Sequence, residues 1–359
     1  MDISELYLKI QSQLDQQLPL VVYKKPGTNE VNCFLQNDDY LHEVSSYDSS
    51  GFVFAPFSNS EKTVIIPDTE SSFFTSIIPF TPKNLKYVSK NSSNVFVEDE
   101  ERQAHISLVN SGIKAIENNS FRKVVLSRKE EVPFSQSNAL EVFKRLVDLY
   151  ANAFVYFWYH PKIGMWLGAT PETLLHIDGD NFSTMSLAGT QPYKGSMEVS
   201  WGAKEIEEQA MVTEFVMKEL TKNVNAIRRS ESYTHKAGTL LHLKTDITGT
   251  LKSSPQNIKN IIEVLHPTPA VCGLPKEEAR SFILHNEGYD RKYYTGFLGE
   301  LHRYKNGASS SSLFVNLRCM EIRKDQTLLY VGGGITKDSI PEKEWEETVK
   351  KTETMKRVL

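Results

Sequence analysis

Two pairs of glutamates, each pair three residues apart, give this sequence its clearest chemical signal. Glu205 and Glu208 lie in AKEIEEQAMVTEFVMKEL, and Glu344 and Glu347 lie in PEKEWEETVKK near the C-terminus. Residues three apart share one face of a helix, so each pair would present two carboxylates to the same side. The ordinary structural interpretation is a solvated acidic helix surface. Taken together, two such helices predict an oxygen-only site for a hard cation, and Mg²⁺ favours few carboxylates, several waters and an anionic substrate.

A run of three glycines precedes the second glutamate pair. Gly332, Gly333 and Gly334 follow the apolar run LLYV, which predicts a strand. Glycines at the end of a strand let another group approach the backbone closely. Pro341 predicts a helix start, and Lys351 would lie one turn beyond Glu347. A ligand lying against the glycines would therefore be close to the carboxylates.

Four single side chains are further candidates, and each has a plainer alternative. Lys123, in the strand FRKVVLSRKEEV, would become a base if burial weakened its hold on a proton, or it reaches solvent from the strand end. Glu172 follows a proline. Its carboxylate is either directed into a site by the rigid loop, or it belongs to an ordinary surface residue. His242 lies between leucines, where a packed histidine is common. Arg318 lies in SLFVNLRCMEI, which predicts one strand, and an arginine on an apolar strand requires an anionic partner.

The composition excludes several classes of protein. Of the 359 residues, 40% are hydrophobic and 24% are charged, which is typical of a globular protein. The net charge of −4 and scattered Lys and Arg predict no nucleic-acid partner. Cys33, Cys272 and Cys319 are odd in number and lack metal spacing, which predicts reduced cysteines. The acidic N-terminus lacks the features of a secretory signal, and no apolar run could span a membrane, so we expect a cytoplasmic protein that binds small molecules.

Hydrophobic periodicity predicts the elements that must position these residues. Helices are expected at 3–14, within 105–119 and at 139–150, and a hairpin is expected to turn at 160–164. A polar connection at 89–101 suggests a soft boundary near residue 100. Phe52, Phe54 and Phe57 are interpreted as sheet packing. Ala188, Gly189 and Thr190 are expected just after a strand, where the backbone could approach a ligand.

Nine motifs occur in an order that resembles one family of enzymes. They are KVVLSR, GATPETLL, LAGT, KEIEEQ, LHLKT, LHPTPAVCGLP, RKYYTGFLG, LRC and GGGITKDSIPEKEWEETVKK. Together they resemble the chorismate-utilising enzymes, which include anthranilate, aminodeoxychorismate, isochorismate and salicylate synthases. The resemblance runs from about 121 to 351. It implies one large α+β domain of two packed antiparallel sheets with helices outside, as in anthranilate synthase component I. Residues 101–359 would form the catalytic region, and 1–100 a divergent part of the same fold.

The resemblance also implies a role for each motif residue. Glu208 and Glu347 match direct magnesium ligands, and Glu205 and Glu344 match flanking carboxylates that orient metal-bound water. Arg318 and Tyr294 match groups that hold the enolpyruvyl carboxylate, and Lys351 matches a lysine near the ring carboxylate. His242 matches a histidine beside the reacting ring. The remaining matches are substrate contacts, at Ala188, Gly189, Thr190, Thr268, Gly273 and Gly332 to Gly334.

Two positions distinguish the branches of the family. Members that use water as the nucleophile carry a lysine where Lys123 lies, and aminodeoxychorismate synthases carry a lysine where Ala188 lies. The resemblance therefore favours an isochorismate synthase, in which Lys123 activates water at ring carbon 2 and Glu172 protonates the hydroxyl leaving carbon 4. A salicylate synthase, an anthranilate synthase-like component and a catalytically silent chorismate-binding subunit remain as alternatives. We expect a monomer without an amidotransferase partner, acting in a menaquinone or siderophore pathway.

Sequence departures from the family pattern occur at two motif positions. Gln209 follows Glu208 where the family has a histidine, and Cys272 replaces a glycine in PAVCG. Neither change removes a predicted side-chain ligand.

Overall fold

Two antiparallel sheets form the centre of the computed structural model, which describes residues 1–78, 95–238, 240–252, 257–305 and 307–359. The nine-stranded sheet has the order β15 (Gly273–Leu274), β7 (Lys123–Pro133), β19 (Gln326–Ile335), β18 (Cys319–Ile322), β9 (Gly164–Thr170), β8 (Phe154–His160), β1 (Leu20–Lys24), β2 (Glu30–Gln36) and β6 (Ser71–Ile77). The ten-stranded sheet has the order β12 (Val224–Arg229), β14 (Leu240–Leu251), β11 (Asn181–Pro192), β10 (Thr173–Asp178), β17 (Ala308–Val315), β16 (Phe297–Lys305), β4 (Gly51–Ala55), β5 (Val64–Pro67) and β3 (His42–Glu43), and β13 (Tyr233–Ala237) also pairs with β14.

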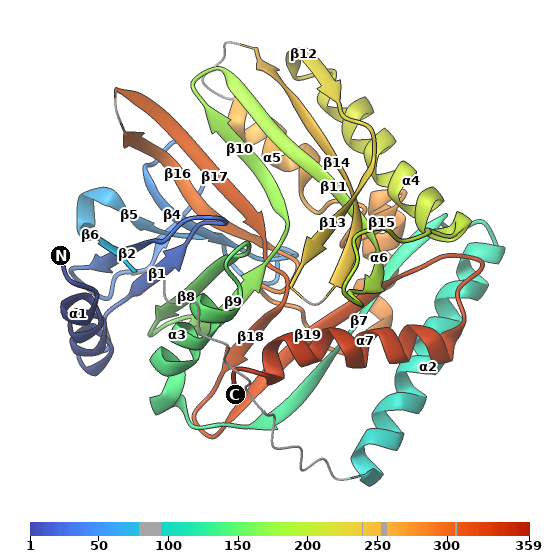
Figure 1. Ribbon diagram of the computed structural model, residues 1–359, viewed down its shortest axis with the longest axis horizontal. Helices are drawn as coiled ribbons and strands as arrows, with labels where there is room; N and C mark the ends of the chain where they lie inside the picture. The colour runs from blue at the N-terminus through green and yellow to red at the C-terminus, as the bar shows by residue number, and fades with distance from the viewer. Residues whose placement is uncertain (79–94, 239, 253–256, 306) are drawn as a thin grey trace.

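Helices lie outside the sheets (Figure 1). Their bounds are α1 (Ile3–Asp15), α2 (Val95–Glu117), α3 (Ala139–Leu149), α4 (Ala203–Leu220), α5 (Asn257–Leu265), α6 (Lys276–Asn286) and α7 (Pro341–Lys356). The helix α7 runs beside α2 and along β19, whereas α4 and α5 cover the ten-stranded sheet. None of the described helices is long and apolar enough to cross a membrane. The predicted α+β architecture of two packed sheets with helices outside is confirmed.

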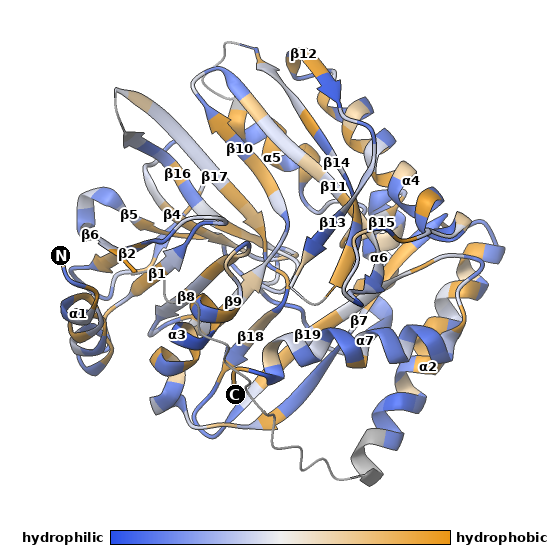
Figure 2. Ribbon diagram, viewed as in Figure 1, coloured by the Kyte–Doolittle hydropathy of each residue, from blue (hydrophilic) through white to orange (hydrophobic). Residues whose placement is uncertain are grey.

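An aromatic core fills the space between the sheets. Phe154 of the nine-stranded sheet stacks on Phe314 of the ten-stranded sheet, with ring centroids 4.1 Å apart. Phe52, Phe54 and Phe57 are buried, which confirms their interpretation as packing residues. Figure 2 shows hydrophobic residues gathered on strands such as β8, whereas α7 is largely hydrophilic. Aromatic rings each bury a large apolar area, so this layer contributes much of the free energy that holds the sheets together.

The chain passes between the two sheets at two neighbouring points. One lies between β9 and β10 at Glu172, and the other lies between β17 and β18 at Arg318. The two crossings are hydrogen-bonded to each other, because Val315 N donates to Glu172 O at 3.0 Å and Ala169 N donates to Arg318 O at 3.0 Å. Glu172 and Arg318 are therefore brought together where the sheets meet.

These crossings correct the prediction that SLFVNLRCMEI is one strand. The strand ends at Val315 and a new one begins at Cys319 in the other sheet. The side chain of Asn316 fixes the break, since it accepts from Tyr156 Oη at 2.7 Å and donates to Tyr293 O at 2.8 Å. Arg318 has a φ of +48°, which a continuous strand does not allow. The segment MWLGATPETLLHID is broken between sheets in the same way, at 171–172.

Several other sequence predictions are confirmed, and some boundaries differ. The first and third helices, the hairpin turn at 160–164 and the helix start at Pro341 occur as predicted. The α2 helix begins at Val95, inside the predicted polar connection, whose residues 89–94 lie outside the described residues. The three glycines lie within β19, paired with β7, and not beyond the strand. Likewise, β11 continues past Ala188 to Pro192, with a bulge where Gly189 has a φ of +68°.

Candidate functional site

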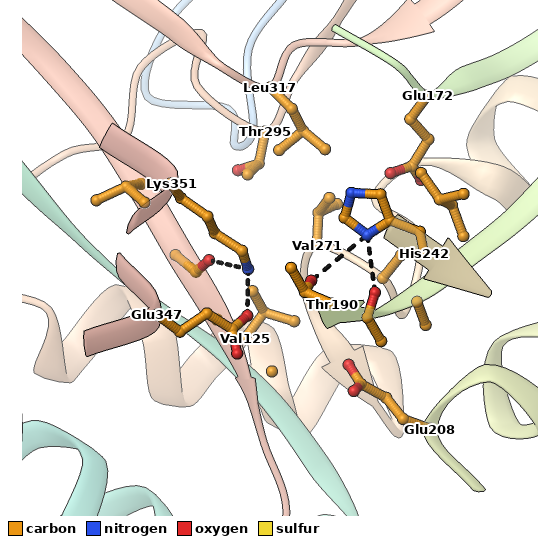
Figure 3. A pocket seen from close by; sticks show the side chains of 18 of the residues that line it. Val125, Glu172, Thr190, Glu208, His242, Val271, Thr295, Leu317, Glu347 and Lys351 are labelled. Atoms are coloured by element: carbon orange, nitrogen blue, oxygen red, sulfur yellow. Dashed lines mark hydrogen bonds and ion pairs between the residues drawn. The ribbon is translucent and has the colours of Figure 1, made fainter. Parts of the chain in front are cut away.

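A pocket lies beside the two crossings, and most of the predicted site residues line it. They are Glu172, Ala188, Gly189, Thr190, Glu205, Glu208, His242, Tyr294, Arg318, Gly332, Gly333, Gly334, Glu347 and Lys351. Figure 3 shows Glu347 and Lys351 entering from α7 on one side, while Glu172, His242 and Glu208 enter from the other. Segments that are far apart in the sequence thus supply one cavity.

Lys123 and Glu208 meet at one wall of this pocket. Lys123 is fully buried on β7, and its Nζ lies 2.9 Å from Glu208 Oε1. Gly334 leaves the space for this contact, because a Cβ at that position would lie 2.4 Å from Glu208 Oε1 and 3.1 Å from Lys123 Cε. The glycine is therefore required by the side chains that pass it.

Glu347 and Lys351 form a second ion pair at the opposite wall. Lys351 Nζ lies 2.6 Å from Glu347 Oε1 and donates to Gly332 O at 3.0 Å. Burial alone would raise the pKa of Glu347, but the ion pair with Lys351 leaves it below its usual value. Glu347 is therefore a carboxylate at neutral pH.

Arg318 brings a half-buried positive charge into the pocket. Its Nη1 donates to Thr354 Oγ1 at 3.2 Å, and no ion pair joins it to a carboxylate within the described part of the chain. Burial lowers the pKa of the guanidinium. The Tyr294 hydroxyl lines the same cavity, and burial raises the pKa of Tyr294, so it remains a neutral donor. An arginine fork and a phenol are suited to holding a carboxylate.

Glu172 is held in its neutral form. Its side chain is buried at the crossing, and burial raises its pKa to about 8, although the positive charge of Lys123 acts in the opposite direction. A carboxyl group with this pKa is mostly protonated at pH 7 and has a proton to give. A neutral carboxylic acid in the pocket lining thus lies within the electrostatic reach of the buried Lys123.

His242 is also neutral, and its hydrogen bonds fix its tautomer. Burial lowers its pKa to about 3, and Nδ1 lies 2.7 Å from the carbonyl oxygen of Gly189. A carbonyl can only accept, so Nδ1 carries the proton and Nε2 carries the lone pair. Nε2 is buried and has no hydrogen-bond partner among the described residues. It is an acceptor that a ligand hydroxyl could satisfy.

Four predicted residues lie outside the pocket lining: Lys123, Thr268, Gly273 and Glu344. Of these, Lys123 contacts the lining residue Glu208. Gly273 pairs with Val124, and a Cβ there would lie 2.3 Å from Lys123 O, so the glycine is needed for strand pairing. Thr268 Oγ1 is buried without a hydrogen-bond partner among the described residues. The Glu344 carboxylate forms an ion pair with Lys204, in which Nζ lies 2.7 Å from Oε1. Burial raises the pKa of Glu344.

The carboxylates fit a hard divalent cation by their chemistry. Glu205, Glu208 and Glu347 all line the pocket, and in Figure 3 the carboxylates of Glu208 and Glu347 both point toward the space between them. In the described ranges, no three His, Cys, Asp or Glu side chains are grouped closely enough to hold a metal by themselves. Mg²⁺ does not need three, since it retains waters and binds anionic substrate groups. Glu208 and Glu347 are thus suitable ligands.

Sequence reasoning missed two features of this site. Lys204 lines the pocket beside Glu205, and its only signal in the sequence was that it precedes the first glutamate pair. Apolar residues, among them Val125, Val271 and Leu317, complete the wall and gave no signal beyond strand or loop propensity.

Gln209, the departure from the family pattern, points into the ten-stranded sheet, where Nε2 donates to Ser186 Oγ at 3.0 Å. It is therefore a packing residue.

The comparison with family models decides the family. The model described as "Chorismate binding enzyme" matches residues 72–359. The chain belongs to the chorismate-binding enzyme family. This family assignment agrees with the resemblance stated above, and the match extends further toward the N-terminus than the motifs do.

Relatives within this family carry related names. The chain is 33% identical over 253 residues to the isochorismate synthase EntC of Escherichia coli, covering 66% of this chain and 62% of the relative. It is 30% identical over 243 residues to the vibriobactin-specific isochorismate synthase of Vibrio cholerae, covering 65% and 60%. It is 33% identical over 202 residues to DhbC of Bacillus subtilis, covering 54% and 50%. The matched part of the chain thus spans about half to three-fifths of the length of these relatives.

Solved structures share the fold over nearly the whole chain. MenF, the menaquinone-specific isochorismate synthase of E. coli, superposes with a TM-score of 0.75 at 21% identity, covering 96% of this chain and 89% of that one. Anthranilate synthase component I of Streptococcus pneumoniae gives 0.68 at 15% identity, covering 94% and 90%. At these low identities, the similarity to the solved structures shows that the fold is shared and shows no more than that.

Proposed function

We propose that the protein is an isochorismate synthase, which converts chorismate reversibly to isochorismate. The observation that carries the proposal is the combination of a buried lysine, Lys123, next to Glu208 at the pocket wall, with a buried neutral carboxyl group, Glu172, in the pocket lining. Exchange of a hydroxyl between two ring carbons requires both a base and an acid. The names of the relatives support the same reaction.

Chorismate carries two carboxylates, and the pocket offers one positively charged side chain for each of them. Arg318, with Tyr294 beside it, would bind the enolpyruvyl carboxylate, because Arg318 lines the pocket and has no ion pair with an acid among the described residues. Lys351 would lie near the ring carboxylate. The glycines of β19 would let the flat ring lie against the backbone. His242 Nε2 would accept a hydrogen bond from a ring hydroxyl.

The proposed reaction moves two protons. Lys123, in its neutral form, takes a proton from water as the water oxygen bonds to ring carbon 2, and the ring double bond shifts. The bond between carbon 4 and its hydroxyl breaks, and Glu172 gives its proton to the departing oxygen, which leaves as water. Because burial raises the pKa of Glu172 to about 8, the carboxyl group is protonated and neutral before the substrate arrives.

A divalent cation is part of the proposal. Glu208 and Glu347 would hold Mg²⁺, with Glu205 and Glu344 as flanking carboxylates. When bound, Mg²⁺ would supply positive charge that offsets the ring carboxylate.

Product analysis tests the proposal. The protein is incubated with chorismate and Mg²⁺, and the products are separated by chromatography, with Lys123→Gln measured alongside. We expect isochorismate from the wild type and a rate at least about 100-fold lower from the variant. Lys129→Gln, at a lysine of the same strand whose side chain is 39% exposed, is the matched control and should keep its activity. Anthranilate fluorescence on addition of ammonium, or no conversion at all, would contradict the proposal.

A further inference from the structure

Lys204 joins the two helices that carry the glutamate pairs. It lies in the first turn of α4, and its Nζ is 2.7 Å from Oε1 of Glu344 on α7. Among the hydrogen bonds and ion pairs of the described residues, this is the one that connects α4 with α7. Loss of Lys204 would therefore remove this polar link between the two helices.

The position of Lys204 places it between Glu344 and the pocket. Lys204 lines the pocket and its side chain is 31% exposed, whereas that of Glu344 is 4% exposed and does not line the cavity. The other oxygen of Glu344, Oε2, lies 3.5 Å from where a Cβ at Gly333 of β19 would be. Glu344 is thus bonded to Lys204 through Oε1 and lies outside the pocket lining.

The other glutamates differ from Glu344 in this respect. Glu208 and Glu347 each have a lysine partner, but their carboxylates line the pocket and face its interior. A cation that enters could contact them directly. Glu344 could reach the same cation only after its bond to Lys204 breaks.

We propose that Lys204 is a positioning residue that keeps Glu344 out of the ligand set of the divalent cation, so that coordination positions stay open for water and substrate. The idea rests on the proposed function in so far as cation and chorismate meet in this pocket. Mg²⁺ takes six ligands, and each carboxylate that binds it directly removes a position that a water or a substrate oxygen could use.

Removing Lys204 has two effects that act in the same direction. Glu344 becomes a buried carboxylate without a cation, which it could regain by turning toward the metal. The positive charge of Lys204, which also acts on Glu208 and Glu347, no longer repels the metal. Both effects tighten metal binding, while the extra ligand slows the reaction.

The experiment titrates Mn²⁺, a hard cation that binds like Mg²⁺, into the protein without chorismate and follows the free ion by electron paramagnetic resonance. We expect Lys204→Met to bind Mn²⁺ at least about tenfold more tightly than the wild type. Adding Glu344→Gln to that variant should remove most of the gain. Lys204→Arg, which keeps the ion pair, should stay near wild type. Lys218→Met, an exposed lysine on the same helix, is the matched control.

Several outcomes would overturn the proposal. They are an unchanged or weaker Mn²⁺ affinity in Lys204→Met, or a gain that survives Glu344→Gln. Circular dichroism checks folding, and Lys204→Gln takes the place of Lys204→Met if the latter unfolds, with tighter binding than the wild type again expected. If chorismate is not converted by any variant, the proposed function fails while the Mn²⁺ titrations still decide the role of Lys204. If chorismate is converted, kcat of Lys204→Met should fall while Lys204→Arg restores it.

Discussion

Lys123 Nζ lies 2.9 Å from Glu208 Oε1, so the proposed base and a proposed metal ligand form one ion pair. The two residues come from β7 and α4, and Gly334 of β19 lies beside both side chains. The arrangement couples the two functions, because any change that moves Glu208 also changes the surroundings of Lys123. It can be tested at the glycine without altering either charge.

Gly334→Ala should separate this pair. The new Cβ would lie 2.4 Å from Glu208 Oε1, and the glutamate end can swing away, so we expect a folded protein. Activity should fall at least about tenfold, since displacement of a catalytic group by 1 Å is costly. Steady-state kinetics and thermal melting measure both. Gly333→Ala is the comparison, because its Cβ would meet Glu344 Oε2 only at 3.5 Å, and it should lose less. Equal losses in the two variants would contradict the steric explanation.

Glu172→Gln should abolish most activity and yet stabilise the protein at alkaline pH. The pKa of Glu172 is raised to about 8, so the folded state binds a proton that the unfolded state releases near pH 4 to 5. Ionisable Glu172 therefore costs the wild type stability as pH rises from about 4.5 to 8. At pH 8 the variant should exceed the wild type by roughly 2 kcal/mol or more in free energy of unfolding.

Denaturant unfolding at pH 5, 7 and 8 measures this difference. The gap between Glu172→Gln and the wild type should shrink as the pH falls toward 5. Glu131→Gln, an exposed residue, should show no such trend. A variant that is less stable than the wild type at each pH would show that Glu172 is not held neutral.

The sequence predicted the elements better than it predicted their connections. Local periodicity was enough for α3, and Pro341 was enough for the start of α7. The crossings at Glu172 and Arg318 could not be predicted in this way. The break before Arg318 depends on two hydrogen bonds of Asn316, which accepts from Tyr156 and donates to Tyr293, both distant in sequence.

The candidate site shows the same division. Spacing alone placed Glu208 and Glu347 in one cavity, because carboxylates three apart on a helix carry a recognisable pattern. Lys204 has no such pattern, and its role follows only from the packing of α4 near α7. Gly273 lies outside this cavity. Its motif predicted a substrate contact, and the structure shows a glycine required for the approach of β15 to β7.

Glu208→Gln and Glu347→Gln should each lower turnover at least about 100-fold without unfolding the protein, because each removes a proposed ligand of Mg²⁺. Excess EDTA should have the same effect on the wild type, and added Mg²⁺ should reverse it. Activity assays with circular dichroism measure these effects. Glu346→Gln is the matched control, since its side chain is 64% exposed on the same helix. Full activity in excess EDTA would contradict the metal requirement.

Arg318→Lys should weaken chorismate binding although the charge is kept. A lysine cannot reproduce the two parallel hydrogen bonds that a guanidinium makes to a carboxylate, so we expect KM to rise about tenfold or more with a smaller change in kcat. The φ of +48° is equally unfavourable for both side chains, so stability should change little. Arg323→Lys, whose side chain is 41% exposed, is the control. An unchanged KM in Arg318→Lys would show that Arg318 does not bind the substrate.

The final prediction concerns the compound that is released. Isochorismate and salicylate synthases share the base, the acid and the metal glutamates, and they differ in whether pyruvate is eliminated from the intermediate. Elimination requires the enolpyruvyl arm to be poised for hydrogen transfer, which depends on the shape of the pocket. We interpret the segments LAGT and SLFVNLRC as more similar to isochorismate synthases than to salicylate synthases, and we therefore expect no elimination.

Incubation from both directions distinguishes the two outcomes. With Mg²⁺ and enzyme, chorismate and isochorismate should approach the same final ratio, because a reversible exchange of hydroxyl groups has one equilibrium. A coupled lactate dehydrogenase assay should detect no pyruvate. Stoichiometric pyruvate with salicylate would mean that the arm held near Arg318 and Tyr294 is placed for elimination. In that case the pocket would carry out the second reaction as well as the first, and the protein would be a salicylate synthase.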